Sequence, residues 1–508
     1  MTEAYPAPAT RRFITASVMA ATVMNSLDST IANVALPHIQ GSISASADEI
    51  TWVLTSYIVA AAIFTPLTGW LAGRFGRKRL MRWSIIGFTI ASGLCGMASN
   101  LDEIVGFRLL QGICGAALIP MSQAIMLDIN PPERQGSAMA VWTMGAILGP
   151  IIGPALGGYL TDNFSWRWVF FINLPVGMLA LLGLSIFLSE TRAAERTRLD
   201  LFGFAMLGLA LASLQLMLDR GQTKDWFSSL EICIEGACVL FFGYLFVVHT
   251  LTARKPFINL ALFADRNFTV SSIMGFFMGV LIFSVLALLP PLLENLMGYP
   301  VVLTGLVTAP RGIGSLITMM LAGRLMKRFD LRLLILTGFL LCAFSAYRMA
   351  SFSPDMDQSI VMSSGVLQGL GTGLIFVPLS TMAFGTLDPA FRNDGTAMFT
   401  LIRNTGSAVG ISVLQAMTVR NTAIVHSRLV EGVRPDNPVL AQASPGFDFT
   451  MPAQVARMNA EITRQASMVG YIDAFWFLFI VTLAAIPLLL LMRKPRKAAG
   501  DDLPLHMD

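Results

Sequence analysis

Fourteen apolar stretches, each about as long as a bilayer is thick, limit what this chain can fold into. A transmembrane helix needs about 20 predominantly apolar residues. Runs of this kind lie near residues 13–36, 50–72, 81–99, 104–127, 137–160, 167–188, 200–218, 230–250, 268–293, 302–323, 332–352, 359–384, 395–418 and 469–492. Only 13% of the 508 residues are charged, against about 25% in an ordinary soluble protein. We therefore expect an all-α polytopic membrane protein, and a soluble enzyme or a nucleic-acid-binding protein is disfavoured.

The placement of positive charge predicts the orientation of these spans. Arg11 and Arg12 precede the first stretch, which is too long for a cleaved signal peptide and is expected to be an uncleaved span. If the N-terminus lies in the cytosol, most of the 35 Lys and Arg residues fall in cytosolic segments, as the positive-inside rule requires. An even number of spans returns the basic run 493–497 to the same side. We expect both termini in the cytosol and residues 419–468 in a long external loop.

Three short motifs recur in the same order, each pair eight predicted spans apart. They are Leu71–Arg74 with Leu321–Arg324, Leu110–Gly112 with Leu367–Gly369, and Gly136–Met139 with Gly395–Met398. Duplicated halves around a site at the bilayer midplane are typical of transporters. The sequence predicts a six-helix bundle in residues 1–190, two linker helices in 191–255 and a second six-helix bundle in 256–508.

Seven motifs taken together resemble one transporter family. They are Leu27–Pro37, Gly69–Lys78, Arg108–Gly112, Gly145–Pro154, Trp166–Gly177, Leu214–Gly221 and Asp225–Ser229. The motif Gly69–Lys78 resembles the loop signature of the major facilitator superfamily. The other six motifs resemble those of its 14-span drug:proton antiporters, in particular the EmrB-type multidrug exporters. The resemblance covers the whole chain. It implies the major facilitator fold, export of hydrophobic or amphipathic drugs in exchange for protons, and a place in the bacterial inner membrane.

Asp28 is the one carboxylate well inside the first six predicted spans. An acid in the hydrocarbon region is unfavourable unless it is paired or protonated, so its default interpretation is functional. Burial disfavours the ionised form and a nearby cation favours it. We expect Asp28 to bind and release the coupling proton, with Arg108 of the fourth span as its cation. The alternative is a permanent structural ion pair.

Other polar residues inside the spans are expected to line a substrate cavity. Helical spacing places Arg108, Gln111, Gly115 and Ser122 on one face of the fourth span and Asn25 beside Asp28 on the first. Arg403 and Asn404 interrupt the thirteenth span. The full predicted set is Asn25, Asn33, Gln111, Gly115, Ser122, Arg403 and Asn404. The alternative is that these residues hold helices together.

Two further motifs are expected to form gating elements, and for the glycine strip this role is what the resemblance implies. Gly145, Gly149, Gly153 and Gly157 recur every four residues, with Pro150 and Pro154 among them, and form a strip that a neighbouring helix can approach closely. Ordinary tight packing would use the same strip. The basic loop, with Gly69, Arg74, Gly76, Arg77 and Lys78, departs from the family at Gly73, where many members carry an Asp that joins a charge lock. We expect Asp128 to pair with Arg74 or Arg77 instead.

No motif for an enzyme or for a bound cofactor occurs in the sequence. A phosphate loop of the form G-x-x-x-x-G-K-[ST] is missing, and the four histidines are scattered, so we expect neither ATP use nor a metal site. The proton gradient is the expected energy source. The resemblance implies a periplasmic EmrA-like adaptor and an outer-membrane channel as partners. Export of a single endogenous metabolite, such as a siderophore or a fatty acid, and more distantly a lipid-modifying membrane enzyme, remain as alternatives.

Overall fold

The structure is a computed structural model that describes residues 5–190, 198–388, 391–434, 436–437, 440, 442 and 446–493. These residues form helices and connecting segments, without a strand among them. In the first part of the chain the helices are α1 (Pro8–Ile43), α2 (Ala47–Ile50), α3 (Trp52–Phe64), α4 (Leu67–Phe75), α5 (Arg77–Met97), α6 (Leu101–Gly115), α7 (Leu118–Asp128), α8 (Pro132–Asn163), α9 (Trp168–Phe171) and α10 (Asn173–Phe187). A middle pair follows, α11 (Leu201–Arg220) and α12 (Leu230–Thr252), joined through η1 (Trp226–Ser228). The last part holds α13 (Ala261–Ala264), α14 (Arg266–Pro291), η2 (Leu292–Leu296), α15 (Val301–Arg328), α16 (Leu331–Met349), α17 (Gln358–Gly385), α18 (Arg392–Glu431), α20 (Pro452–Ala485) and η4 (Ile486–Leu491).

The expected fold class, an all-α polytopic membrane protein, is confirmed. Twelve spans formed by the described helices are long and apolar enough to cross a bilayer, and the pair α3 and α4, bent by 58°, makes a thirteenth. α1 is 36 residues long but carries polar residues in its middle, which lowers its hydropathy. With α1 included, the structure is compatible with fourteen spans. The basic residues 494–497 lie outside the described residues.

Local sequence signals set where several helices begin and end. Asn100 caps α6 by accepting a hydrogen bond from the Glu103 amide, as a short polar side chain does at a helix start. Gly76 ends α4 with a φ of 86°, a backbone conformation that glycine adopts without strain, and α5 starts directly after it. Asp357 caps α17, and hydrogen bonds from Ser359 hold the pKa of its carboxyl below the ordinary value.

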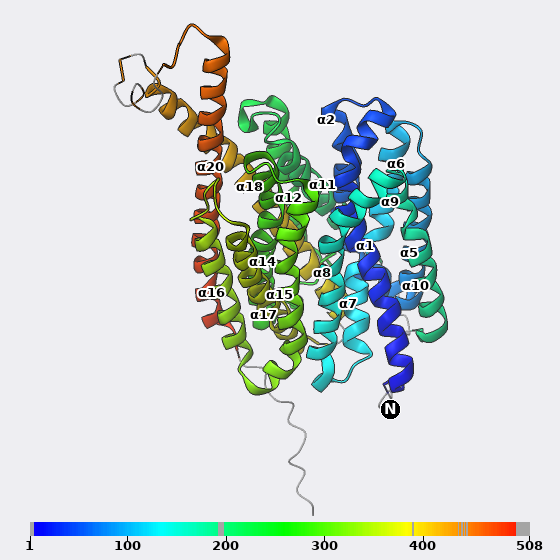
Figure 1. Cartoon of the computed structure of the whole chain (residues 1–508). Helices are drawn as coiled ribbons and strands as arrows, with labels where there is room; N and C mark the ends of the chain where they lie inside the picture. The colour runs from blue at the N-terminus through cyan, green and yellow to red at the C-terminus, as the bar shows by residue number, and fades with distance from the viewer. Residues whose placement is uncertain are drawn as a thin grey trace, which may run out of the picture.

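The helices form two bundles that lie side by side (Figure 1). In the N-terminal bundle α1 packs on α8 and α10, and α6 packs on α3 and α5. In the C-terminal bundle α17 packs on α15 and α16, and α18 packs on α14 and α20. α11 packs on α3, and its last turn reaches both bundles: Asp219 hydrogen-bonds to Thr55 of α3, and the Leu218 carbonyl accepts a 2.7 Å bond from Ser412 of α18. The middle pair therefore touches both halves.

The two bundles share an apolar core at one end only. We call the face where α1 begins the proximal face and the opposite face the distal face. One buried apolar cluster joins both bundles toward the proximal face and includes Val18, Met126, Met319 and Phe384. Toward the distal face each bundle has its own cluster, one within residues 27–172 and another within 276–481. The halves are therefore packed together on the proximal side.

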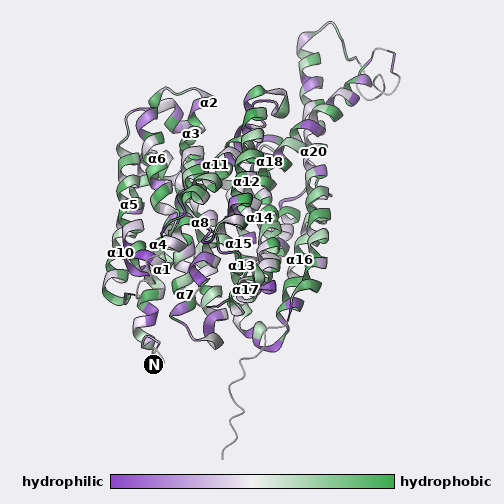
Figure 2. Cartoon of the chain, turned by 180° about the vertical axis from the view of Figure 1, so that it is seen from behind, coloured by the Kyte–Doolittle hydropathy of each residue, from purple (hydrophilic) through white to green (hydrophobic). Residues whose placement is uncertain are grey.

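The segment expected as a long loop at 419–468 is largely helical, which corrects that prediction. α18 runs for 40 residues to Glu431, and α20 starts at Pro452. Both helices project beyond the rest of the distal face (Figure 1). The purple, hydrophilic stretches on this projection in Figure 2 explain the difference. Polarity marks where a span leaves the bilayer, but residues such as Arg and Glu are good helix formers, so a helix can continue into water.

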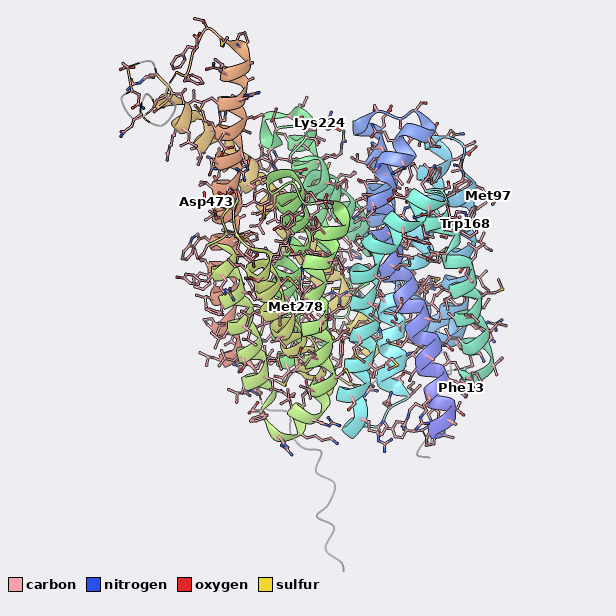
Figure 3. All side chains as sticks on the ribbon, in the orientation of Figure 1. Phe13, Met97, Trp168, Lys224, Met278 and Asp473 are labelled. Atoms are coloured by element: carbon pink, nitrogen blue, oxygen red, sulfur yellow. The ribbon has the colours of Figure 1, made fainter. Side chains whose placement is uncertain are left out.

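Two hydrogen bonds join the projecting helices. Asn421 donates to Asp473 at 2.9 Å, and His426 is 3.0 Å from the Asn459 side-chain oxygen. Figure 3 places Asp473 below the projecting part of α20, at a lower level than Lys224 of the middle pair. We call residues 419–431 and 452–468 the distal hairpin. Residues 435, 438–439, 441 and 443–445, between its two helices, lie outside the described residues.

Candidate functional site

The carboxylate of Asp28 is fully buried and accepts three hydrogen bonds. Arg108 of α6 donates to Oδ2 at 2.6 Å, and Gln111, one turn further along α6, donates to Oδ1 at 2.8 Å. Asn173, the first residue of α10, also donates to Oδ1, at 2.9 Å. The spacing of Arg108 and Gln111 puts both side chains on the face of α6 that meets α1. The structure thus brings together the predicted pair and two amide groups.

The guanidinium of Arg108 is held from several sides. Its side chain is 1% exposed, its Nε donates to the Val53 carbonyl at 3.0 Å, and its Nη1 also donates to the Gln111 side-chain oxygen at 2.9 Å. The ring of Tyr57 lies 4.3 Å from the guanidinium carbon, in a cation–π arrangement. The charge of Arg108 is therefore balanced by one carboxylate and fixed by neutral groups.

Asn173 was not among the predicted site residues. It donates to the Ser92 hydroxyl at 2.9 Å as well as to Asp28, and Ser92 in turn donates to the Phe170 carbonyl at 2.8 Å. The side-chain oxygen of Asn173 is buried without a hydrogen-bond partner among the described residues. The sequence did contain a signal that could have identified Asn173, because this residue lies in the motif Trp166–Gly177 that carries part of the family resemblance.

Each hydrogen-bonding partner of the Asp28 carboxylate donates to it, and Arg108 adds a positive charge. A carboxylic acid can accept fewer hydrogen bonds than a carboxylate because one oxygen carries the proton. Protonation would also leave the Arg108 cation buried without its counter-charge, which is strongly unfavourable. The ion pair therefore joins α1 to α6, and Asn173 adds α10 to the same contact.

The remaining predicted cavity residues of the N-terminal half do not all join this cluster. Asn25 donates to the Tyr57 hydroxyl at 3.1 Å and packs against Gly115. Ser122 lies on α7 and accepts a 2.8 Å bond from the Trp142 indole of α8. Asn33 is exposed on α1. The predicted single polar face of the fourth span is divided because the span breaks into α6 and α7 after Gly115.

Arg403 and Asn404 lie in the C-terminal half, on α18. The buried Arg403 donates to the exposed Asn404 side chain at 3.3 Å, and its guanidinium carbon lies 5.5 Å from the centre of the Phe376 ring. That ring is 5.9 Å from the Trp142 ring of the N-terminal half. Ser122 and Arg403 are thus connected through two aromatic side chains that meet where the bundles touch.

The glycine strip of α8 faces α1. A Cβ at Gly149 would lie 2.5 Å from the Leu27 nitrogen, and one at Gly157 would lie 2.8 Å from a side-chain carbon of Ile31. The other positions of the strip also face α1: Gly145 meets Met19 and Gly153 meets Thr30. Pro150 and Pro154 lie within α8, which continues as one helix to Asn163. Because Leu27 precedes Asp28, the strip sets how closely α8 approaches the buried carboxylate.

Charged residues join the two bundles at the proximal face. Arg77 forms an ion pair with Asp128, and its Nε donates to the Asn393 side chain at 2.6 Å. Arg392, at the start of α18, donates to Asp128 at 2.9 Å. We call Arg77, Asp128, Arg392 and Asn393 the proximal lock. The expected pairing of Asp128 with a basic-loop arginine is formed by Arg77.

The other members of the basic loop have separate surroundings. Arg74 lies over the rings of Trp70 and Phe75, at 5.3 and 5.8 Å. Lys78 is partly exposed in the first turn of α5. Gly69 packs against the Asp394 side chain of α18, where a larger residue would collide. The lock thus includes α18 residues that the sequence pattern did not single out.

Comparisons with known proteins agree with this geometry. The family model of the Major Facilitator Superfamily matches residues 18–411. The chain is 36% identical over 492 residues to the multidrug export protein EmrB of Escherichia coli strain K12, and 35% identical over 492 residues to the fatty acid resistance protein FarB of Neisseria gonorrhoeae. Each alignment covers 96% of this chain, with 96% of EmrB and 97% of FarB.

Solved structures show the same fold at lower sequence identity. The human organic anion transporter MFSD10 superposes with a TM-score of 0.59 at 15% identity, covering 94% of this chain and 100% of that one. The proton:xylose symporter XylE also gives a TM-score of 0.59, at 13% identity, covering 94% of this chain and 96% of that one.

Proposed function

Because this chain belongs to the major facilitator superfamily, we propose that it exports hydrophobic or amphipathic compounds in exchange for protons. The similarity to multidrug export proteins over almost the whole chain supports the drug-exporter part of this proposal. The buried Asp28–Arg108 pair is the observation that supports proton coupling. No cofactor is needed, because the proton gradient supplies the energy.

The proposal assigns the proximal face to the cytosol of a bacterium and the distal face to the outside of its inner membrane. The positive-inside rule supports this orientation, since the basic residues of the loop between α4 and α5 lie on the proximal face. The bundles are packed together on the proximal side, so this conformation is closed toward the cytosol in the proposed alternating-access cycle. Opening the proximal lock and the shared core would give the inward-facing state.

Protonation of Asp28 changes the balance between these two states. The ionised carboxylate holds Arg108, Gln111 and Asn173 around α1, and the neutral acid releases part of this set. A ligand shifts a conformational equilibrium by its difference in affinity for the two states, and here the proton is one ligand and the drug is the other. Proton entry from the distal side and release on the proximal side would then drive export.

Sealed vesicles containing the purified protein test this proposal. Anionic, neutral and cationic amphiphiles are each added to vesicles without a pH gradient, and at least one of them should drive a proton movement that an internal pH dye records. Collapse of an imposed proton gradient should stop drug accumulation, and ATP should have no effect. Transport that persists without the gradient and stops when ATP is removed would contradict the proposal.

Export of one endogenous metabolite is the second candidate. Its support is the similarity to a fatty acid resistance protein, which is nearly as strong as the similarity to the multidrug exporters. A panel of unrelated toxic compounds in a pump-deleted host separates the two candidates. Protection against several chemical classes supports multidrug export, and protection against fatty acids alone supports the narrow exporter.

We also propose a periplasmic adaptor of the EmrA type, with an outer-membrane channel, as partners on the distal side. The distal hairpin supports this, because it extends the membrane helices outward and presents the exposed apolar residues Ile424, Val430 and Val455. Affinity purification with a co-expressed adaptor tests the docking site. Adaptor that is still retained after deletion of residues 430–460 would exclude the hairpin.

A further inference from the structure

Arg403 is a buried cation without an anionic partner in the part of the chain that the structure describes. Its residue is 9% exposed, and none of the ion pairs within residues 5–190, 198–388, 391–434 and 446–493 includes it. Its one side-chain hydrogen bond is the 3.3 Å contact with Asn404, and its Nε has no hydrogen-bond partner among the described residues. One turn earlier on α18, the hydroxyl of Thr400 is also buried without a partner there.

A second arginine reaches the same turn of α14. The Arg403 backbone packs against Gly279, and Arg311 of α15 donates to the Ile282 carbonyl at 2.8 Å. Met278, next to Gly279, lies at about mid-height of the C-terminal bundle in Figure 3. The Arg403 backbone and the Arg311 guanidinium therefore contact the same part of α14, near mid-height of the C-terminal bundle.

The charges of the two bundles are not balanced in the same way. In the N-terminal bundle Asp28 cancels Arg108. In the C-terminal bundle Arg311 has a carbonyl and Arg403 has an amide as acceptor, and neither pairs with a carboxylate of the described residues. A cation at membrane depth is unfavourable without a partner, and such residues usually pair or mark a substrate path. An anionic ligand group would supply the missing charge.

We propose that Arg403 binds the anionic headgroup of an amphipathic substrate, whose apolar part lies along Phe376. The guanidinium already lies over the Phe376 ring, so an anion on its free Nε edge would have an apolar surface beside it. The exposed Asn404 marks the side from which the headgroup enters. This inference rests on the proposed export function and names its substrate class: amphiphiles with a carboxylate or sulfonate rather than a quaternary ammonium group.

Equilibrium binding of three eight-carbon probes tests the assignment. Octanesulfonate, octanol and octyltrimethylammonium differ in headgroup charge and share the alkyl chain. With the full-length protein in lipid nanodiscs, and empty nanodiscs as the blank, octanesulfonate should bind about tenfold or more tighter than the other two. A hydrogen bond to a charged group contributes enough binding free energy for a difference in affinity of about tenfold or more. Arg403→Gln should remove the preference, and Arg403→Lys should keep most of it because the charge remains.

Arg348→Gln is the matched control, since it removes a guanidinium from the C-terminal bundle at the end of α16, away from Phe376. It should leave the preference unchanged. Equal or tighter binding of octyltrimethylammonium to the wild type, or an undiminished preference in Arg403→Gln, overturns the inference. If Arg403→Gln does not yield folded protein, the wild-type probe ranking and Arg403→Lys decide.

Binding requires no proton gradient, so the two proposals can fail separately. An Arg403-dependent preference together with vesicles that show no proton-driven export contradicts the proposed function alone. Proton-driven export of cationic compounds without that preference contradicts the headgroup assignment alone.

Discussion

Asp128, the last residue of α7 in the N-terminal bundle, accepts a 2.9 Å hydrogen bond from Arg392, the first residue of α18 in the C-terminal bundle. Asp128 also pairs with Arg77, so one carboxylate is shared by cations from the two halves. Gly73 lacks the carboxylate that the family resemblance would place there. The lock therefore uses a carboxylate from a different helix, at the same face of the molecule.

Asp128→Asn should shift the protein toward the inward-facing state. The variant removes the charge that holds Arg77 and Arg392 together, while the shared apolar core remains. Because the Asp128 side chain is 32% exposed and solvent screens its pairs, we expect about 1 kcal/mol, or roughly a fivefold change in the ratio of the two states. Distances between spin labels on the proximal ends of α4 and α18 should show a larger open population.

Arg74→Gln is the control for the lock, because Arg74 contacts aromatic rings rather than Asp128. Its distance distribution should match that of the wild type. If Asp128→Asn and Arg74→Gln give the same distributions, the ion pairs do not hold the bundles together.

Gly149→Ala should disturb the site of Asp28 although the residues do not bond to each other. A Cβ at Gly149 would lie 2.5 Å from the Leu27 nitrogen, so α8 and α1 must move apart. Overpacking of this kind lowers the free energy of unfolding by about 1–3 kcal/mol. We expect a lower thermal transition and reduced export. Gly158→Ala, where the nearest atom would be 3.9 Å away on Val34, should resemble the wild type in both measurements.

The distal hairpin should be helical and accessible from outside the cell. Single cysteines at positions 426 and 459, in a background without the five native cysteines, should react with a membrane-impermeant reagent added to whole cells. The 3.0 Å contact of His426 with Asn459 also predicts that a short bifunctional thiol reagent can crosslink a cysteine pair at these positions. A cysteine at position 78 should react only after the membrane is opened, and its labelling from outside would contradict the orientation.

Features that depend on one helix could be predicted from the sequence, and features that depend on the contact of two helices could not. Hydropathy predicted where the spans lie. The spacing of Arg108 and Gln111 along their span predicted that the two side chains lie on one face of the helix. The partner of Asp128 across the bundles was not predictable, since Arg392 lies 264 residues away and nothing in its local pattern marks it. Asn173 was visible only as part of a motif.

The end of a span in the bilayer and the end of its helix are different properties. The polar residues after position 418 were interpreted as a loop because hydropathy falls there. α18 continues to Glu431 because those residues still favour a helix and α20 packs alongside. The opposite relationship holds in α1, which was predicted as a span although its central Asn25 and Asp28 lower its hydropathy.

Arg108 is left without its counter-charge when Asp28 is neutralised, and this shapes the test of coupling. Asp28→Asn keeps the size of the side chain and removes the charge that a proton would remove. Breaking one side of a buried pair is destabilising by about 3–5 kcal/mol. We therefore expect Asp28→Asn to be less stable than the wild type, and the double variant Asp28→Asn/Arg108→Gln to recover stability. Neither variant should couple drug transport to proton movement.

Proton movement driven by drug in sealed vesicles, measured for the wild type, Asp28→Asn and the double variant, tests the central claim most directly. The wild type should move protons when drug is added, and both variants should bind drug without moving protons. Proton movement at the wild-type rate in Asp28→Asn would contradict the claim and place the coupling proton on another group.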